Sequence, residues 1–186
     1  MTRKSLEALV QEAPPGPPPP ARGKARRTRR APAAKMGARA AVIAAYDSAR
    51  LSPREWVPHS VRLPADVADR LIRQVATGLT LEIEPGRPLH LRPAASHYTQ
   101  AALSAIPFTD VGKAGAIGAR WRKAHLRAVP GNGSSPGTQL HRDTHQAMLD
   151  LTPWLRTLPD RVRIQDVAAG AVSALLDELA EDAAGE

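Results

Sequence analysis

Residues with the types and spacing needed for catalysis or metal binding are few in this sequence. His141, Asp143 and His145 form an H-x-D-x-H pattern, and histidines four residues apart on a helix could share a metal ion. The chain has no cysteine and no third ligand stands nearby, so we interpret the pattern as the polar start of a helix and predict no metal site. No nucleophile with a matching base is recognisable, and we therefore expect neither an enzyme nor a bound cofactor.

Three glycines in the segment VGKAGAIGARW, residues 111–121, are the nearest approach to a phosphate-binding loop. They follow no predicted strand, and the segment lacks the G-x-x-x-x-G-K-[ST] pattern. We predict instead a basic helix over residues 108–129 that connects two parts of the chain. Its Trp121 either lies on a nucleic-acid backbone beside the helix's cations or anchors the helix to the core, and both interpretations are open.

The distribution of charge indicates the chemistry of the partner. The net charge is +8, with nine basic and two acidic residues in residues 1–35, a net charge of +6 in residues 36–176, and five acids without a base in the last ten residues. This balance favours a polyanion, and nucleic acid is favoured over membrane because no hydrophobic face accompanies the arginines of the tail. Without cysteine or an apolar run of about 20 residues, we expect a cytoplasmic protein with neither disulfides nor membrane spans.

Residues 1–35 are predicted to form a disordered basic tail. The sequence PPGPPPPARGKARRTRRAPAA combines proline, glycine and like charges, so it cannot bury apolar surface. Ahead of it, Leu6, Leu9 and Val10 stand at helical spacing in a peptide that is too short to be stable alone. The tail is either a solubilising spacer or a binding arm, and residues 181–186 form a second, acidic tail.

An Ala-rich helix is expected within residues 36–56, and the strongest structural signal follows it. His59 to Leu63 alternate with the period of a strand, and Pro64 suits the first turn of the helix that comes next. Apolar residues recur on that helix every four positions, at Val67, Leu71 and Val75.

Two further elements complete this first unit, residues 57–107. Apolar and other residues alternate within residues 79–91 on both sides of a Pro85-Gly86 turn, and this pattern predicts a small hairpin. Ser96 is a suitable N-cap for a second helix. The apolar face of that helix is formed by Tyr98, Ala102, Leu103 and Ile106. Beyond the basic helix, the glycine- and serine-rich residues 130–137 are predicted to be a linker.

The pattern of the first unit recurs in residues 138–180. The spacing from Val61 to Thr138, which we call the long offset, also separates Leu63 from Leu140, Val67 from Thr144 and Leu71 from Met148. A second spacing, from Tyr98 to Val167, which we call the short offset, also separates Ala102 from Ala171, Leu103 from Val172 and Ile106 from Leu175. The short offset is smaller by the length of a hairpin that is present in the first copy only. We therefore predict an internal duplication.

A short strand, the transition VRLP at residues 61–64 and two helices within about 45 residues resemble the ribbon-helix-helix superfamily of Arc, MetJ and CopG-type regulators. The resemblance covers residues 57–107 well and 137–180 loosely. In that superfamily two strands pair antiparallel, and the ribbon enters the major groove of DNA. The resemblance implies a mainly α fold with short β-ribbons and tandem units, which pair either within one chain or between two chains of a dimer.

The resemblance also assigns roles to individual residues. The base contacts fall to Ser60, Arg62, Gln139 and His141, whose neighbours in the strands are apolar. The phosphate contacts fall to the starts of the second helices and to the basic helix, at Ser96, His97, Gln165, Arg120, Arg122 and Lys123. Asp166 is a departure, because an acid at that position repels phosphate, and Arg62 has the alternative role of a solvated strand charge.

An apolar and basic peptide, an arginine-rich arm and a ribbon-helix-helix body together resemble small plasmid centromere-binding partition proteins. This resemblance implies a sequence-specific double-stranded DNA-binding protein that recruits a ParA-type ATPase and is associated with the plasmid or nucleoid. The tail residues expected to contact DNA or the ATPase are Arg3, Lys4, Arg26, Arg27, Arg29 and Arg30. Two alternatives stay open: a transcriptional repressor that regulates its own operon, and a relaxosome or scaffold protein that binds mainly other proteins.

Overall fold

The computed structural model describes residues 37–125, 134–137 and 139–185. The chain divides between Ala34 and Lys35 into two units, one residue from the predicted boundary between tail and body, and the described elements belong to the second unit. The predicted tail and most of the predicted linker lie outside the described residues. None of the helices described has the length and apolar character needed to cross a membrane.

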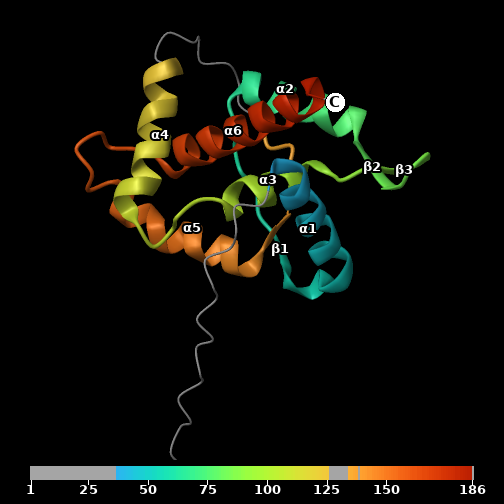
Figure 1. Cartoon of the computed structure of the whole chain (residues 1–186). Helices are drawn as coiled ribbons and strands as arrows, with labels where there is room; N and C mark the ends of the chain where they lie inside the picture. The colour runs from blue at the N-terminus through green and yellow to red at the C-terminus, as the bar shows by residue number, and fades with distance from the viewer. Residues whose placement is uncertain (1–36, 126–133, 138, 186) are drawn as a thin grey trace, which may run out of the picture. The chain divides into compact units, whose positions relative to one another are not determined.

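The described body is mainly helical with two short antiparallel β-ribbons, as the sequence predicts (Figure 1). In chain order its elements are α1 (Ala38–Leu51), the 3-10 turn η2 (Pro53–Glu55), β1 (Trp56–Pro58), α2 (Ala65–Thr77), β2 (Leu79–Glu84), β3 (Arg87–Leu91), α3 (Ala95–Ser104), α4 (Val111–His125), β4 (Gln139–His141), α5 (Arg142–Leu155) and α6 (Ile164–Ala184).

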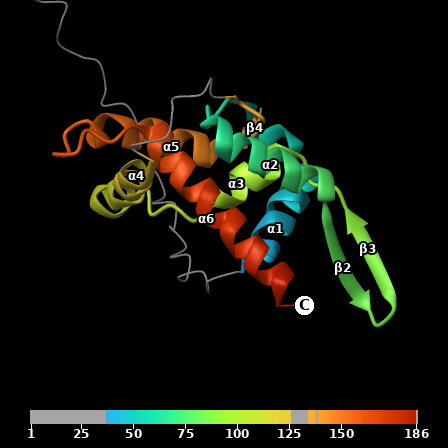
Figure 2. The same cartoon turned by 90° about the horizontal axis from the view of Figure 1, so that it is seen from above.

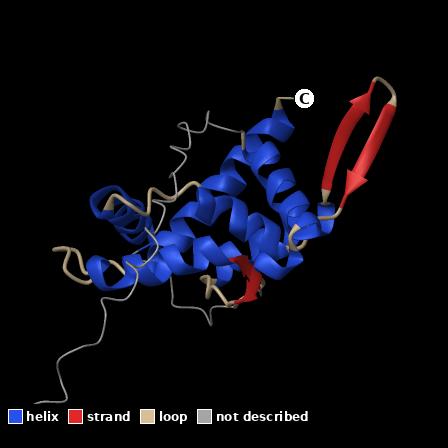
Figure 3. Ribbon diagram, turned by 90° about the horizontal axis from the view of Figure 1, so that it is seen from below, coloured by secondary structure: helices blue, strands red, loops and turns tan. Residues whose placement is uncertain are grey.

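Local sequence sets several of these boundaries. α1 ends at Leu51, because Pro53 cannot continue a helix and restricts the residue before it. The predicted hairpin is confirmed as β2 and β3, which project beyond the helices (Figures 2 and 3). Gly78 opens it with a φ of 71°, and a Cβ at this position would lie only 2.8 Å from the carbonyl oxygen of Leu91. Only glycine fits this entry without a shift of the backbone.

The starts of the helices reproduce both predicted offsets. The long offset relates the start of α2 at Ala65 to the start of α5 at Arg142. The short offset relates the start of α3 at Ala95 to the start of α6 at Ile164. The hairpin lies between α2 and α3, and no strand is described between α5 and α6, so the insertion accounts for the difference between the offsets.

The two halves of the body pair through a β-ribbon within one chain. β1 and β4 are antiparallel with Val57 opposite Leu140, and an isolated bridge joins Leu63 to Ser134 through backbone hydrogen bonds of 2.8 and 3.0 Å. Val57 lies six residues before Leu63, and Ser134 lies six before Leu140, so both pairings belong to one register. We call residues 56–63 and 134–141 together the central ribbon.

The two pairings of the central ribbon are equivalent under the sequence repeat. The long offset takes Val57 to Ser134 and Leu63 to Leu140, so it exchanges one pairing for the other. An antiparallel ribbon whose two strands were related by an approximate two-fold axis would show the same exchange.

The predicted hydrogen-bonded strand at His59 to Leu63 is wrong in its bounds. The paired residues are 56–58 and Leu63, and no pairing of residues 59–62 with the described residues is present. Pro136, which falls opposite Val61 in this register, has no backbone N–H to donate. Gly137 packs instead on α3, where an added Cβ would lie 3.0 Å from the Thr99 hydroxyl. The central ribbon is therefore paired at both ends and open in the middle.

A single hydrophobic core joins the halves. The equivalent residues Leu63 and Leu140 are each 1% exposed, and Tyr98 and Val167, which are equivalent under the short offset, are fully buried. α1 packs mainly on α3, and α4 packs mainly on α6. In each half, the first helix therefore packs on the last one. From the sequence, the segment of α4 was predicted only to be a basic connecting helix.

Candidate nucleic-acid interface

The predicted alternation of side chains is present in the central ribbon. Ser60 and Arg62 are exposed, whereas Val61 and Leu63 between and after them are buried. In the second half Gln139 is exposed beside the buried Leu140. The long offset relates Arg62 to Gln139, so the two residues occupy equivalent positions of the two strands. Three of the four predicted base-contacting residues therefore share the solvent side of the central ribbon.

The fourth, His141, is in a different environment. Its Nε2 lies 3.0 Å from a carboxylate oxygen of Glu55, its Nδ1 lies 3.9 Å from Asp143, and its ring is half-buried. The backbone N–H of His141 donates to the side-chain oxygen of Gln100 at 2.9 Å. His145 does not join it, because its ring lies against His59 with the ring centroids 4.4 Å apart. The described residues contain no group of three or more potential metal ligands.

Gln100 is a structural residue that sequence reasoning missed. It is 7% exposed on α3 and accepts from His141, while its Nε2 donates to Thr144 at 2.7 Å and to Ser104 at 2.9 Å. These bonds tie the second strand of the central ribbon and the first turn of α5 to α3. The signal available in the sequence was an amide on a helix whose neighbouring positions are apolar, since a buried amide needs partners for both of its polar atoms.

The start of α3, where Ser96 and His97 were predicted to hold a phosphate, is half-buried. His97 Nδ1 accepts from the backbone N–H of Ala94 at 2.9 Å, and its ring meets the edges of Tyr46 and Trp56. Burial lowers the pKa of His97. Gly137 of the central ribbon packs close to the Ser96 backbone. His97 therefore caps the helix and fills the space beneath β1.

The start of α6 is more open and lies beside the basic end of α4. Gln165 is exposed in the first turn, while Asp166 accepts from the backbone N–H of Arg163 at 3.0 Å and so caps the helix. Arg122 donates to the backbone oxygens of Asp160 and Arg161 at 2.9 and 3.3 Å, which binds α4 to the loop before α6. Arg161 has a φ of 46°, in the left-handed region.

A hollow of about 830 Å³ results where α4 meets this loop. We call it the cationic hollow, because four of its lining side chains are basic and one is acidic. Its lining residues are Ala119, Arg120, Arg122, Lys123, Pro159, Asp160 and Arg161. The structure therefore brings the three predicted phosphate-contacting residues of the basic helix together and adds Arg161, which sequence reasoning did not assign.

Trp121 packs against the hydrophobic core and stacks on His125, with ring centroids 4.5 Å apart. Of the two interpretations of this residue, the anchoring role agrees with its position. Trp154, in contrast, is 61% exposed at the end of α5 and does not belong to the core.

Comparisons with protein-family models, with curated proteins and with solved structures give no match for this chain. Its function is therefore inferred from the residues and their geometry.

Proposed function

We propose that this protein binds double-stranded DNA in a sequence-specific manner by placing the central ribbon in the major groove. The observation that carries the proposal is that the long offset exchanges the pairings Val57–Leu140 and Leu63–Ser134. It supports a tandem ribbon-helix-helix arrangement in which both strands of the ribbon come from one chain. A two-stranded ribbon of this kind has the width that the major groove admits.

The exposed side chains of the central ribbon supply the base contacts in this proposal. Arg62 has the geometry to donate two hydrogen bonds to guanine O6 and N7, and Gln139 to pair with adenine N6 and N7. Neither side chain has a hydrogen bond or ion pair within the part of the chain that the structure describes. Because the two strands present different residues at equivalent positions, the preferred DNA site is expected to be non-palindromic.

The cationic hollow supplies the phosphate contacts. Four basic side chains and one carboxylate, Asp160, line it, and the exposed Gln165 in the first turn of α6 lies close to it in sequence. Lysine and arginine on a DNA backbone release condensed counterions, so these residues contribute affinity without base preference.

The test is selection of a preferred site from random duplexes, followed by titration of that site and of a random duplex. Arg62→Ala is expected to weaken binding to the selected site by about 1–3 kcal/mol and to leave binding to the random duplex nearly unchanged. Arg73→Ala, at an exposed position of α2, is the matched control. Equal losses on both duplexes would make Arg62 a phosphate contact, and the absence of any preferred site would overturn the proposal.

A partition role is the more specific form of this proposal and depends on residues 1–35, which lie outside the described residues. Arg3 and Lys4 beside Leu6 and Leu9 have the chemistry to bind a ParA-type ATPase and to stabilise charge on a transferred phosphoryl group. The expected result is that Arg3→Ala or Lys4→Ala abolishes stimulation of the ATPase without loss of binding, while the Leu6→Ala/Leu9→Ala variant loses binding. Equal stimulation by all variants would favour a repressor instead.

A further inference from the structure

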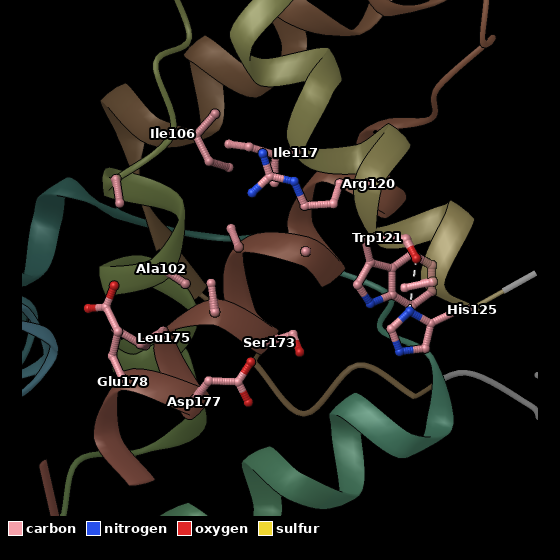
Figure 4. A pocket seen from close by; sticks show the side chains of 15 residues that line it. Ala102, Ile106, Ile117, Arg120, Trp121, His125, Ser173, Leu175, Asp177 and Glu178 are labelled. Carbon is pink, nitrogen blue, oxygen red and sulfur yellow. Dashed lines mark hydrogen bonds between the residues drawn. The ribbon is translucent and has the colours of Figure 1, made fainter. Parts of the chain in front are cut away.

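A cavity of about 410 Å³ lies between the C-terminal part of α3, α4 and the middle of α6 (Figure 4). Its apolar floor includes Ile106 from the turn after α3, Ile117 of α4 and Leu175 of α6. Positions 102, 105 and 106, at the end of α3 and in the turn after it, are equivalent under the short offset to positions 171, 174 and 175 of α6. The cavity therefore opens where the last helices of the two halves meet, and its volume is in the range of about 300–1,000 Å³ that small-molecule sites occupy.

Two residues of α4 that line this cavity carry hydrogen-bond donors without an acceptor among the described residues. The indole Nε1 of Trp121 is buried and has no hydrogen-bond partner among the described residues. The guanidinium group of Arg120 has no hydrogen bond or ion pair within the same residues, and Figure 4 shows it extending between α4 and α3 towards Ile106. A buried N–H group and an adjacent cation both call for an acceptor, and an anionic acceptor satisfies both.

The other end of the cavity is acidic. Asp177 is already engaged by Arg70, which donates to its carboxylate at 2.5 Å and to Ser173 at 3.2 Å. Glu178 has no such partner in the described chain and lies across the cavity from Arg120 and Trp121 (Figure 4). A bound molecule would therefore meet donors at one end, an acceptor at the other and apolar side chains between them.

We propose that this cavity binds a small apolar carboxylate that carries a hydroxyl or amino group at its opposite end. The carboxylate accepts hydrogen bonds from Arg120 and Trp121, the apolar body covers Ile106, Ile117 and Leu175, and the distal group donates to Glu178. The opposed charges at the two ends fix the orientation of the ligand. Arg120 also lines the cationic hollow, so this site is tested without DNA.

The experiment uses the full chain and the fluorescent anion 8-anilinonaphthalene-1-sulfonate as the reporter. The competitors are 3-(4-hydroxyphenyl)propionate, its primary amide and tyramine. We expect the carboxylate to displace the reporter at a concentration at least tenfold lower than the amide or the amine, and to shift the indole N–H resonance of Trp121. Equal displacement by the three competitors, or no saturable binding of the reporter, would overturn the proposal.

Two pairs of variants locate the site. Ala174→Trp fills the cavity from an exposed position of α6, and Ala116→Trp places the same side chain on an exposed position of α4 outside it. Arg120→Gln removes the cation, and Lys113→Gln, at an exposed position of the same helix outside the cavity, is its control. We expect Ala174→Trp to abolish binding, Arg120→Gln to weaken the carboxylate at least tenfold, and both controls to bind as wild type, with folding checked by circular dichroism. Loss of binding in a control, or retention in Ala174→Trp, would place the site elsewhere.

Discussion

The two halves of the body have the same order of elements but use them differently. Both contain a helix, a ribbon strand and two further helices, yet α3 has ten residues and α6 has 21. Six consecutive residues of α3, from Tyr98 to Leu103, are buried, whereas α6 buries one side and exposes the other. α3 is therefore enclosed by its neighbours, while α6 crosses the body as a cover (Figure 2). Two segments can have the same order of elements and still occupy unequal positions in the fold.

The comparison also distinguishes the positions that both halves bury in the core from the elements that only one half contains. The equivalent leucines of the central ribbon are buried to the same extent in both halves. The hairpin between α2 and α3 and the final turns of α6 have no counterpart, and both lie at the margin of the body (Figure 3). The shared positions are those where a buried side chain meets both halves, so substitutions there are expected to have the largest effects.

The largest expected effect is at Leu63 and Leu140. Leu63→Ala and Leu140→Ala should each reduce the free energy of unfolding by about 2–5 kcal/mol, because both side chains are almost fully buried in one core. Urea unfolding followed by circular dichroism and by tryptophan fluorescence should give one coincident transition for both variants. Two separate transitions, or a loss in one half only, would show that the halves fold independently.

The next largest effect is expected at Gln100, whose side-chain amide joins the two halves. Gln100→Leu should reduce the free energy of unfolding by about 1–3 kcal/mol, because the backbone N–H of His141 loses its acceptor and the hydroxyl of Thr144 loses its donor. Gln146→Leu is the matched control, since Gln146 is exposed and contacts only Asp150 on its own helix among the described residues. Its effect should stay within about 0.5 kcal/mol. Equal effects of the two variants would mean that Gln100 does not hold the ribbon.

A smaller effect is expected from pH at the contact between His59 and His145. Burial lowers the pKa of His59, and the charge of His145 lowers it further. Burial lowers the pKa of His97 in the same half. The unfolded chain then binds protons more readily, so stability is complete above the ordinary histidine pKa of 6.5 and declines as the pH falls below it. The His59→Gln variant should lose less stability than wild type between pH 7 and pH 5, and a parallel decline in both proteins would contradict the assignment.

The smallest effect is expected from the hairpin. Replacement of residues 80–90 by a two-residue turn should change the free energy of unfolding by less than about 1 kcal/mol, because the entropy cost of closing a loop grows only slowly with its length. Thermal unfolding should remain a single transition. A larger loss would show that the hairpin contributes to the core, although most of its described side chains beyond Leu79 are exposed or half-buried.

The elements whose signals are local could be predicted from the sequence. The apolar periods and Pro64 gave the helices α2 and α5 at the right offset, and Pro85-Gly86 gave the hairpin. The opening in the middle of the central ribbon could not be predicted, because it depends on Gly137 meeting Thr99 across the fold. Only part of the cationic hollow could be predicted. The cations of α4 are visible in the sequence, whereas Arg161 comes close to them only because the loop before α6 packs against α4.

Pairing of the central ribbon within one chain has a consequence for behaviour on dilution. In a ribbon shared between two chains, the strands separate when the protein concentration falls below the dissociation constant of the dimer. Here the segment between the two strands keeps them in the same molecule, so their effective concentration does not depend on how many copies a cell contains. A surface built across this ribbon is complete in every folded chain, including the first one synthesised.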